Sequence, residues 1–376
     1  MPDGYRAAVV GATGAVGRKV LQVLAERDFP LCELVPFASA RSEGKPVSFK
    51  GRDLDCQVLS EEAVQGFDLA FMAAGGSVSR EWAPRFADAG ALVIDKTSYW
   101  RMDPQVPLVV PEVNPDAAAE ALTGRGIISS PNCSTMALVV ALHPLHREAT
   151  LEEVVVSTYQ SVSGTGNAAV EELESQSHAL LHRSEPPAPA VYPHQIAFNV
   201  LPHVETFPDG DAYSTEERKM MNETRKILGA SEEELRITAT CARVPVMVGH
   251  SESVRVRARE PLSVARAREL LSKAQGVVVV DDPAANRYPT AIDAAERDEV
   301  FVGRLRHDPG PGGERYLNMW VVGDNLRKGA ATNAVQIADL LHERGYLRGA
   351  HARPGRPEHV PAGAGAHVRR PTESIH

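Results

Sequence analysis

A short strand, a run of small residues and a helix follow one another directly at the start of the chain. Arg6–Val10 has the composition of a β-strand and leads into Gly11–Gly17, which reads GATGAVG. Lys19–Arg27 then carries apolar residues at helical spacing. Glycines at such a turn let the backbone approach a pyrophosphate, which the N-terminus of the next helix attracts. The spacing is GxxGxxG and not GxGxxG, so an ordinary tight turn remains an alternative.

The residues after the second expected strand bear on which dinucleotide would bind. Leu34–Ala38 is apolar, and an NAD site usually places Asp or Glu at the end of this strand to hold the ribose 2′-hydroxyl. Here Ser39, Arg41 and Ser42 occupy that place. A guanidinium fork and hydroxyl donors suit a 2′-phosphate. The pattern favours NADP over NAD, with a solvated polar loop as the alternative.

Strands and helices continue to alternate over the following hundred or so residues. Asp68–Ala74 is strand-like, a helix-like stretch runs to Ala89, and Ala91–Asp95 is the next strand. This order predicts a parallel, doubly wound sheet that binds its ligands at the carboxyl ends of the strands. Asp95–Arg101 lies at such an end, and so does the segment after Gly126–Ile128.

Cys133 stands at that second strand end, shortly before the apolar stretch Met136–Leu142. We therefore expect Cys133 in the first turn of a helix, where unpaired N–H groups and the helix dipole favour the thiolate. The chain has four cysteines and no CxxC pair, which fits reduced thiols better than a disulfide framework or a zinc site. A single cysteine is more often a small buried residue than a nucleophile, so the other residues must decide.

A second domain is expected after Leu151, because 376 residues exceed one typical core. Strand-like segments recur there with helices between them, which indicates an α+β domain on a mostly antiparallel or mixed sheet: Val154–Gln160, Leu235–Thr240, Ser253–Arg257 and Leu317–Val322. Gly329–Arg344 predicts an amphipathic helix that returns to pack on the first domain. From Ala350 the chain lacks periodicity, which predicts disorder.

Composition excludes several classes of function. The formal net charge of −9 argues against general affinity for nucleic acid. The sequence contains no long apolar run and no signal-peptide pattern, so we expect a cytoplasmic protein that does not contact membranes. His178 and His182 have the spacing of a metal pair, but no third ligand is evident and we expect no metal.

Several charged residues are ambiguous when taken singly. His250 follows a glycine at the end of an apolar run, so it is a candidate proton-transfer partner for Cys133 or a structural histidine. Glu216 and Lys219 share one helix face, which usually means a solvated pair. Arg243 is equally open.

Together the segments resemble the aspartate-β-semialdehyde dehydrogenase family. The resemblance covers residues 5–346 and rests on these motifs, in chain order: GATGAVG, ASARSEGK, SYWRM, PNCST, STYQSVSGTG, EERKM, CARVPVMVGHSES and GDNLRKGAA. It implies an α/β fold with a doubly wound, Rossmann-like NADP-binding domain formed by residues 1–132 and 329–348. An α+β catalytic and dimerisation domain would span residues 133–328, and residues 349–376 would form a disordered tail.

The resemblance also implies an activity and a site. Members convert L-aspartyl 4-phosphate and NADPH reversibly into L-aspartate 4-semialdehyde, on the route to lysine, methionine and threonine, and form homodimers. The implied catalytic residues are Cys133 as the thioester-forming nucleophile, His250 as acid and base, and Gln160 as the residue that positions the substrate. The implied substrate contacts are Arg243 to the α-carboxylate, Glu216 to the α-ammonium, and Arg101, Asn132 and Lys219 to phosphate, with Gln160 beside them.

The same resemblance implies three groups of cofactor contacts. They are Gly11, Thr13, Gly14, Ala15 and Val16 at the pyrophosphate, Ser39, Arg41 and Ser42 at the 2′-phosphate, and Ser163, Gly164 and Asn325 beside the nicotinamide. Lys96 departs from the family pattern, which has Asn at this place, and so affects the expected local contacts with phosphate or nicotinamide.

Three other functions compete with this one. N-acetyl-γ-glutamyl-phosphate reductase shares the architecture and the thioester chemistry, but its substrate has no free ammonium and less need for Glu216. A cysteine hydrolase using Cys133 and His250 leaves the glycine loop unexplained. A regulator that binds NADP without catalysing a reaction would give Cys133 no chemical role.

Overall fold

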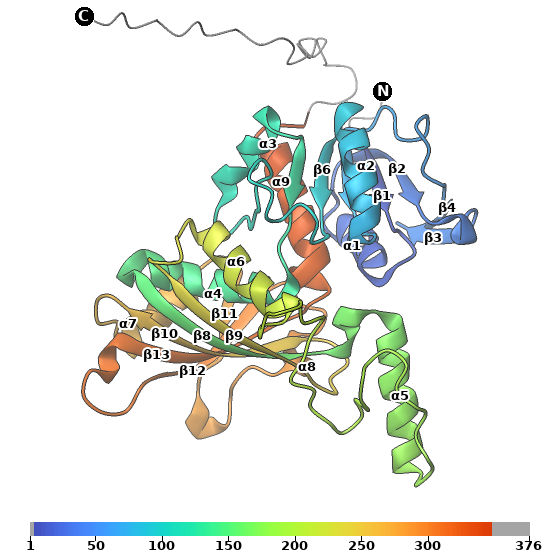
Figure 1. Ribbon diagram of the computed structural model, residues 1–376. Coiled ribbons are helices and arrows are strands. Elements are labelled where there is room, and N and C mark those ends of the chain that lie inside the picture. The colour runs from blue at the N-terminus through green and yellow to red at the C-terminus, as the bar shows by residue number, and fades with distance from the viewer. Residues whose placement is uncertain (1–3, 348–376) are drawn as a thin grey trace, which may run out of the picture.

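The computed structural model describes residues 4–347, and Figure 1 shows two sheets in separate layers. The first sheet is parallel throughout and has the strand order β2-β1-β5-β6-β7. Its strands are β1 (Tyr5–Val10), β2 (Leu31–Phe37), β5 (Leu69–Met72), β6 (Leu92–Asp95) and β7 (Ile127–Ser129). The chain reverses its direction of winding between β1 and β5, and the loop Gly11–Gly17 begins at that switch point, where such sheets bind their ligands.

Helices cover both faces of this sheet, which confirms the doubly wound prediction. The helix α1 (Ala15–Glu26) and the C-terminal helix α9 (Asn333–Glu343) share a core with one face, while α2 (Gly76–Asp88) packs on the other. Successive residues of β1 alternate between these cores, since Ala7 and Val9 belong to one and Ala8 and Val10 to the other.

Smaller elements complete this part of the chain. They are the hairpin of β3 (Pro46–Phe49) and β4 (Arg52–Asp55), the one-turn helix α3 (Glu120–Thr123), and 3₁₀ turns that include Ala40–Ser42 directly after β2.

The second sheet has six strands in the order β11-β12-β13-β10-β8-β9 and is mixed, as the sequence predicted. The pairs β8/β9 and β11/β12 are parallel, and the other neighbours are antiparallel. Its strands are β8 (Leu151–Gln160), β9 (Arg236–Arg243), β10 (His250–Ala258), β11 (Val277–Val279), β12 (Val300–His307) and β13 (Tyr316–Gly323).

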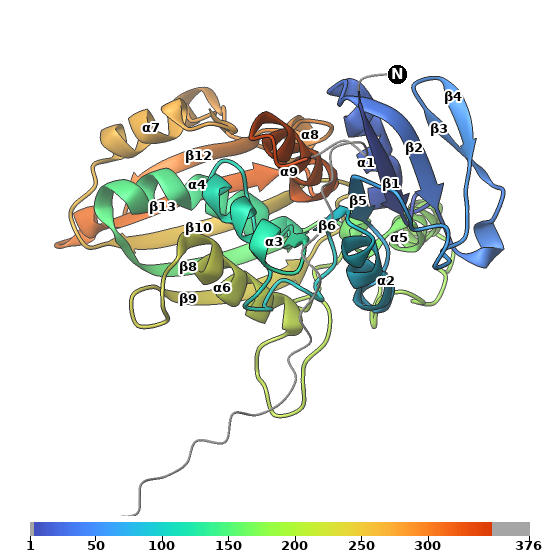
Figure 2. The ribbon, with the colours of Figure 1, turned by 90° about the horizontal axis from the view of Figure 1, so that it is seen from above.

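Three helices lie across one face of this sheet: α4 (Cys133–Ala149), α6 (Thr215–Leu228) and α7 (Val264–Lys273), seen from above in Figure 2. Residues 134–142 of α4 are all buried, as expected for a helix enclosed by other elements. The helix α5 (Asn167–Leu181) projects away from both layers in Figure 1, and α8 (Ala291–Ala294) is a single turn beside β13.

The end of the described chain returns to the first sheet, as predicted. Before α9 the backbone forms a π-helix, Arg327–Thr332, which packs against both α1 and α4. Within it Lys328 is 1% exposed, and its Nζ donates to both carboxylate oxygens of Glu112 at 2.8 and 2.7 Å. Gln336 contributes a further contact to each partner. This buried ion pair fixes the C-terminal segment to the loop after β6.

Replacing Lys328 by Met should destabilise the protein by about 3 kcal/mol or more, because Glu112 would stay buried without its partner. Urea unfolding followed by circular dichroism measures the change. The double variant Lys328→Met/Glu112→Leu should recover much of the loss, since two apolar side chains leave no unpaired charge. A double variant as unstable as the sum of both single variants would contradict this account.

Candidate functional site

The N-terminus of α4 places Cys133 at the carboxyl edge of the first sheet. Asn132 caps the helix, and its Oδ1 accepts hydrogen bonds from the backbone N–H groups of Ser134 and Thr135 at 2.9 and 3.3 Å. Asparagine is among the most favourable N-cap residues. Pro131 precedes it and has no backbone N–H to donate. Cys133 therefore lies in the first helical turn, as its position in the sequence predicts.

His250 faces this cysteine from the second sheet. Its Nε2 lies 3.3 Å from the Cys133 Sγ, and its Nδ1 lies 3.0 Å from the backbone nitrogen of Ser161. A backbone N–H can only donate, so Nδ1 accepts and the neutral ring carries its proton on Nε2, directed at the sulfur. Asn325 supports this arrangement by accepting from the Ser161 hydroxyl at 3.0 Å and from the Gly249 N–H at 2.9 Å.

The electrostatics of this pair differ from the expectation of a thiolate. Burial raises the pKa of Cys133 to about 11, and the nearby Glu216 carboxylate adds to the rise, against Lys96, Arg243 and Arg101. Burial also lowers the pKa of His250 well below its usual value, and Arg243 lowers it further. Both groups are therefore neutral near pH 7, because desolvation is the largest influence on each pKa.

Glu216 lies at the centre of a second group of polar side chains. Its carboxylate accepts from the Asn132 amide at 3.0 Å and from the Gln160 amide at 3.0 Å, and Lys219 lies 3.5 Å away. Glu216 is only 2% exposed. A solvated pair on the helix surface is therefore the wrong interpretation of Glu216 and Lys219. Lys219 also binds Glu205.

Two buried arginines border the same region. Arg243 donates to the Ser161 carbonyl at 2.7 Å, and Arg101 donates to Glu223 at 3.0 Å. In each guanidinium the Nε has no hydrogen-bond partner among the described residues. A buried, unpaired N–H on a cationic group is a donor for an anionic ligand.

Sheet register explains why these groups converge. Gln160 ends β8 opposite Arg243, which ends the parallel strand β9. The antiparallel strand β10 begins at His250 at the same edge. The ends of β8 and β9 and the start of α4 border a cavity of about 280 Å³, whose lining includes Asn132, Cys133, Gln160, Gly164, Glu216 and Arg243. A space of this size accommodates a small polar metabolite.

The expected dinucleotide residues form a suitable cradle after β1 and β2. Gly11 has a φ of +85°, and a Cβ on Gly17 would lie 2.2 Å from the Gly11 carbonyl oxygen, so this turn requires glycine at both positions. No side chain caps the N-terminus of α1, which follows Thr13 and Gly14 and begins with Ala15 and Val16. Ser39, Arg41 and Ser42 lie at the 3₁₀ turn after β2, and no acid ends that strand.

The expected nicotinamide residues lie beside His250. The Asn325 amide donates to the Ser163 hydroxyl at 3.0 Å. A Cβ on Gly164 would come within 3.2 Å of both Arg243 and His250, so a larger residue here would press on the site. The π-helix connects this region to the cradle, because it packs on both α1 and α4, and a Cβ on its Gly329 would lie 2.9 Å from the Cβ of Cys133.

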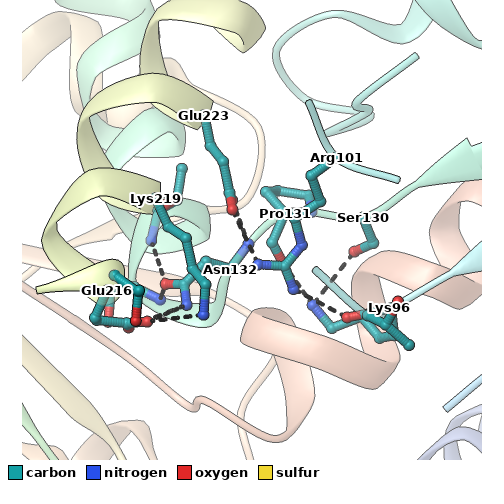
Figure 3. Close-up of polar contacts among 12 residues, drawn as sticks. Lys96, Arg101, Ser130, Pro131, Asn132, Glu216, Lys219 and Glu223 are labelled. Carbon is teal, nitrogen blue, oxygen red and sulfur yellow. Dashed lines mark hydrogen bonds and ion pairs between the residues drawn. The ribbon is translucent and has the colours of Figure 1, made fainter. Parts of the chain in front are cut away.

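Sequence reasoning missed two residues of this site and left the contacts of a third open. Ser161 orients His250, and only its place next to Gln160 hints at this. Glu223 accepts from the Asn132 N–H at 2.7 Å, and it lies two helical turns beyond Glu216 on the same face of α6 (Figure 3). Lys96 stood out as a departure, and its Nζ donates to the Pro131 carbonyl at 2.6 Å.

Two other features of the chain can be stated for residues 4–347. No group of three or more His, Cys, Asp or Glu side chains is arranged to hold a metal ion in this range, and the rings of His178 and His182 stack 4.2 Å apart. Within the same residues no helix is both long and apolar enough to cross a membrane. The tail predicted for residues 349–376 lies outside the described residues.

Comparisons with known proteins agree with this geometry. Residues 6–121 match the family model of the semialdehyde dehydrogenase NAD binding domain, and residues 142–328 match that of the semialdehyde dehydrogenase dimerisation domain. The aspartate-semialdehyde dehydrogenase of Aquifex aeolicus is 53% identical over 92% of this chain and 100% of its own length. That of Bacillus subtilis is 46% identical over 91% of this chain and 98% of its own.

Solved structures give the same result. Aspartate semialdehyde dehydrogenase II from Vibrio cholerae, complexed with ASA, has a TM-score of 0.86 and 44% identity, covering 90% of this chain and 98% of its own. The enzyme from Candida albicans, solved with NADP, has a TM-score of 0.70 and 26% identity, covering 91% of this chain and 100% of its own. A chain that matches these relatives over nine-tenths of its length, and that carries the paired cysteine and histidine between its two sheets, belongs to the aspartate-semialdehyde dehydrogenase family.

Proposed function

We propose that this protein interconverts L-aspartyl 4-phosphate and L-aspartate 4-semialdehyde, with NADPH as the reductant in the biosynthetic direction. One observation carries the proposal. Cys133, which His250 contacts, lines a cavity that a carboxylate, Glu216, and a guanidinium, Arg243, also line. An amino-acid phosphate has an ammonium, a carboxylate and a phosphate, and so requires binding groups of both signs.

The substrate would lie across the cavity in one direction. Arg243 would bind the α-carboxylate through a bidentate fork, and its unpaired Nε supports this role. Glu216 would bind the α-ammonium. Arg101, Asn132 and Lys219 would bind the phosphate, and Gln160 would hold the reacting carbonyl group beside Cys133.

Cys133 would act as the nucleophile of the reaction. Its Sγ bonds to the acyl carbon as the S–H bond breaks, and the carbon–oxygen bond to phosphate breaks. Phosphate leaves with the electrons of that bond and with the thiol proton, and a thioester remains. NADPH, when bound, supplies the hydride that reduces this thioester. The proton on Nε2 of His250 stabilises negative charge at the sulfur and then at the carbonyl oxygen of the substrate, because it lies within hydrogen-bond distance of the reacting centre.

Three groups of residues would hold NADP. Gly11, Thr13, Gly14, Ala15 and Val16 would bind the pyrophosphate at the uncapped N-terminus of α1. Ser39, Arg41 and Ser42 would bind the 2′-phosphate, which is supported by the missing acid after β2. Ser163, Gly164 and Asn325 would border the nicotinamide, supported by their contacts around His250.

The assembly and the location follow from the same family. We propose an NADP-binding domain of residues 1–132 and 329–348 and a catalytic and dimerisation domain of residues 133–328, because α4 packs with the second sheet and α9 with the first. A homodimer is supported by the match to a dimerisation domain. The face of the second sheet away from α4 exposes Val155 and Tyr159 for such a contact. Four unpaired cysteines support a cytoplasmic location.

The buried Glu216 favours this function over N-acetyl-γ-glutamyl-phosphate reductase, whose substrate has no free ammonium. A buried carboxylate in the cavity would need its charge compensated, and the substrate's own ammonium provides this. The cradle after β1 and β2 likewise disfavours a cysteine hydrolase.

The wild-type protein should reduce NADP when given L-aspartate semialdehyde and phosphate, and the rate at 340 nm should depend on phosphate. Cys133→Ala should lower turnover by at least about 10³-fold while NADP still binds, because the acyl carrier is missing. Wild-type rates in this variant would exclude the thioester mechanism. Phosphate-independent hydrolysis in the wild type would instead favour a hydrolase.

Arg41→Ala should raise the KM for NADP by about tenfold or more and leave the KM for NAD nearly unchanged, because only NADP has a 2′-phosphate. Initial rates at varied cofactor concentration measure both constants. Lys45→Ala is the matched control, since it removes an exposed positive charge from the same loop. Equal effects of Arg41→Ala on both cofactors would exclude the proposed contact.

Glu216→Gln should speed the alkylation of Cys133 by iodoacetamide at pH 7 but slow turnover. The Glu216 carboxylate helps to raise the pKa of the Cys133 thiol, so neutralising the carboxylate lowers that pKa. The thiolate fraction then increases by about tenfold for each pKa unit by which the thiol pKa falls. In the wild type the alkylation rate should keep rising from pH 7 to 9, because the folded pKa lies near 11. A rate that levels off below pH 7 would show that the thiol is already ionised.

A further inference from the structure

One face of α6 carries four charged residues at helical spacing: Glu216, Lys219, Glu223 and Lys226. The first two belong to the proposed substrate site. Lys226 donates to the backbone carbonyls of Arg101, Asp103 and Val106, and so fixes the loop after β6 to this helix. Glu223 is 1% exposed, and the proposed chemistry gives it no task.

The Glu223 carboxylate bridges two parts of the site (Figure 3). Its Oε2 accepts from the backbone N–H of Asn132 at 2.7 Å, directly before the cysteine. Its Oε1 accepts from Arg101 Nη1 at 3.0 Å. One carboxylate therefore sets the spacing between the guanidinium proposed to bind phosphate and the main chain that carries Cys133.

The other polar group of the same peptide is held as well. The N–H of Asn132 and the carbonyl of Pro131 belong to one peptide unit, and that carbonyl accepts from Lys96 Nζ at 2.6 Å. Arg101 Nη2 donates to the backbone carbonyl of Lys96 at 2.9 Å and so closes the ring. Burial lowers the pKa of Lys96 to about 7, with Arg101 adding to the shift, but its amine can donate in either state.

A buried carboxylate at this place is electrostatically unfavourable for the reaction. It opposes the binding of phosphate and the ionisation of Cys133, and Arg101 compensates only part of its charge. Geometry supplies the benefit, because the orientation of the peptide before Asn132 determines where α4 begins and hence where Sγ lies. An error of about 1 Å at a reacting atom can lower a rate by about 10²-fold.

We propose that Glu223 is a positioning residue for the acyl-transfer step, a role that rests on the proposed function: with Lys96 it fixes the Pro131–Asn132 peptide from both sides, and it holds Arg101 at a set distance from Cys133. The site is therefore built on α6, whose successive turns position the ammonium, the phosphate and the nucleophile.

Two variants of Glu223 test the length of its side chain and its negative charge separately. Glu223→Gln keeps the length and one acceptor oxygen but presents an amide to Arg101, while Glu223→Asp keeps the charge and is one methylene too short to reach both partners. Both should lower kcat by about 10- to 100-fold and raise the KM for phosphate. Glu233→Gln, an exposed change just beyond the same helix, is the matched control and should match the wild type.

Additional measurements distinguish positioning from loss of fold. Glu223→Gln leaves the buried Arg101 charge without its carboxylate and should therefore lower the melting temperature. The folded variant should still bind NADP like the wild type, and iodoacetamide should alkylate its Cys133 at least as fast as in the wild type, since a negative charge has been removed. Lys96→Met acts on the carbonyl end of the same peptide. The double variant Lys96→Met/Glu223→Gln should therefore lower kcat by less than the product of the two single-variant factors.

Wild-type kcat in Glu223→Gln, or full activity in Glu223→Asp, would overturn the proposal, and so would independent effects of Lys96→Met and Glu223→Gln. Should Glu223→Gln not fold, an unchanged kcat in Lys96→Met overturns it equally. A wild-type protein that fails to reduce NADP with aspartate semialdehyde and phosphate refutes the proposed function instead, so the two failures are distinguishable.

Discussion

The beginning of α4 is the constraint on which the rest of this site depends. Asn132 ends the connection from the parallel sheet and caps a helix that is enclosed by the mixed sheet and its neighbours. Cys133 is therefore fixed to both layers. His250, at the start of β10, lies 3.3 Å from its sulfur, and Gln160 and Arg243, at the ends of β8 and β9, line the same cavity. The π-helix packs against α4 and α1. A shift of α4 would change every one of these contacts.

Burial of charge is the second organising feature. Glu216, Glu223, Arg101 and Arg243 are each less than 10% exposed, and they are held by one another and by backbone groups. Such groups are strongly coupled, because an unpaired buried charge is costly. The neutral cysteine and histidine are a consequence of the same burial. A zwitterionic ligand that pairs with Glu216 would change the field at the thiol directly.

Much of the fold could be predicted, because its signals are local. The glycine turn, the alternating strands and the returning C-terminal helix are each encoded in contiguous residues, and the structure confirms them. The electrostatics could not be predicted in this way. Helix position alone indicated a thiolate at Cys133, whereas the opposing desolvation depends on elements that are distant in sequence. Ser161 and Glu223 escaped notice because a serine and a helical glutamate have many ordinary uses.

The sequence by itself determined the class of fold, the place of Cys133 before a helix, and the absence of an acid after the second strand. Each of these depends on the order of neighbouring residues and on the period of a strand or a helix. Only the tertiary structure decided that Glu216 is buried, that His250 presents Nε2 to the sulfur, and that Glu223 and Lys96 hold one peptide from both sides. These facts arise where α4, α6 and two sheets meet, and no local pattern specifies such a meeting.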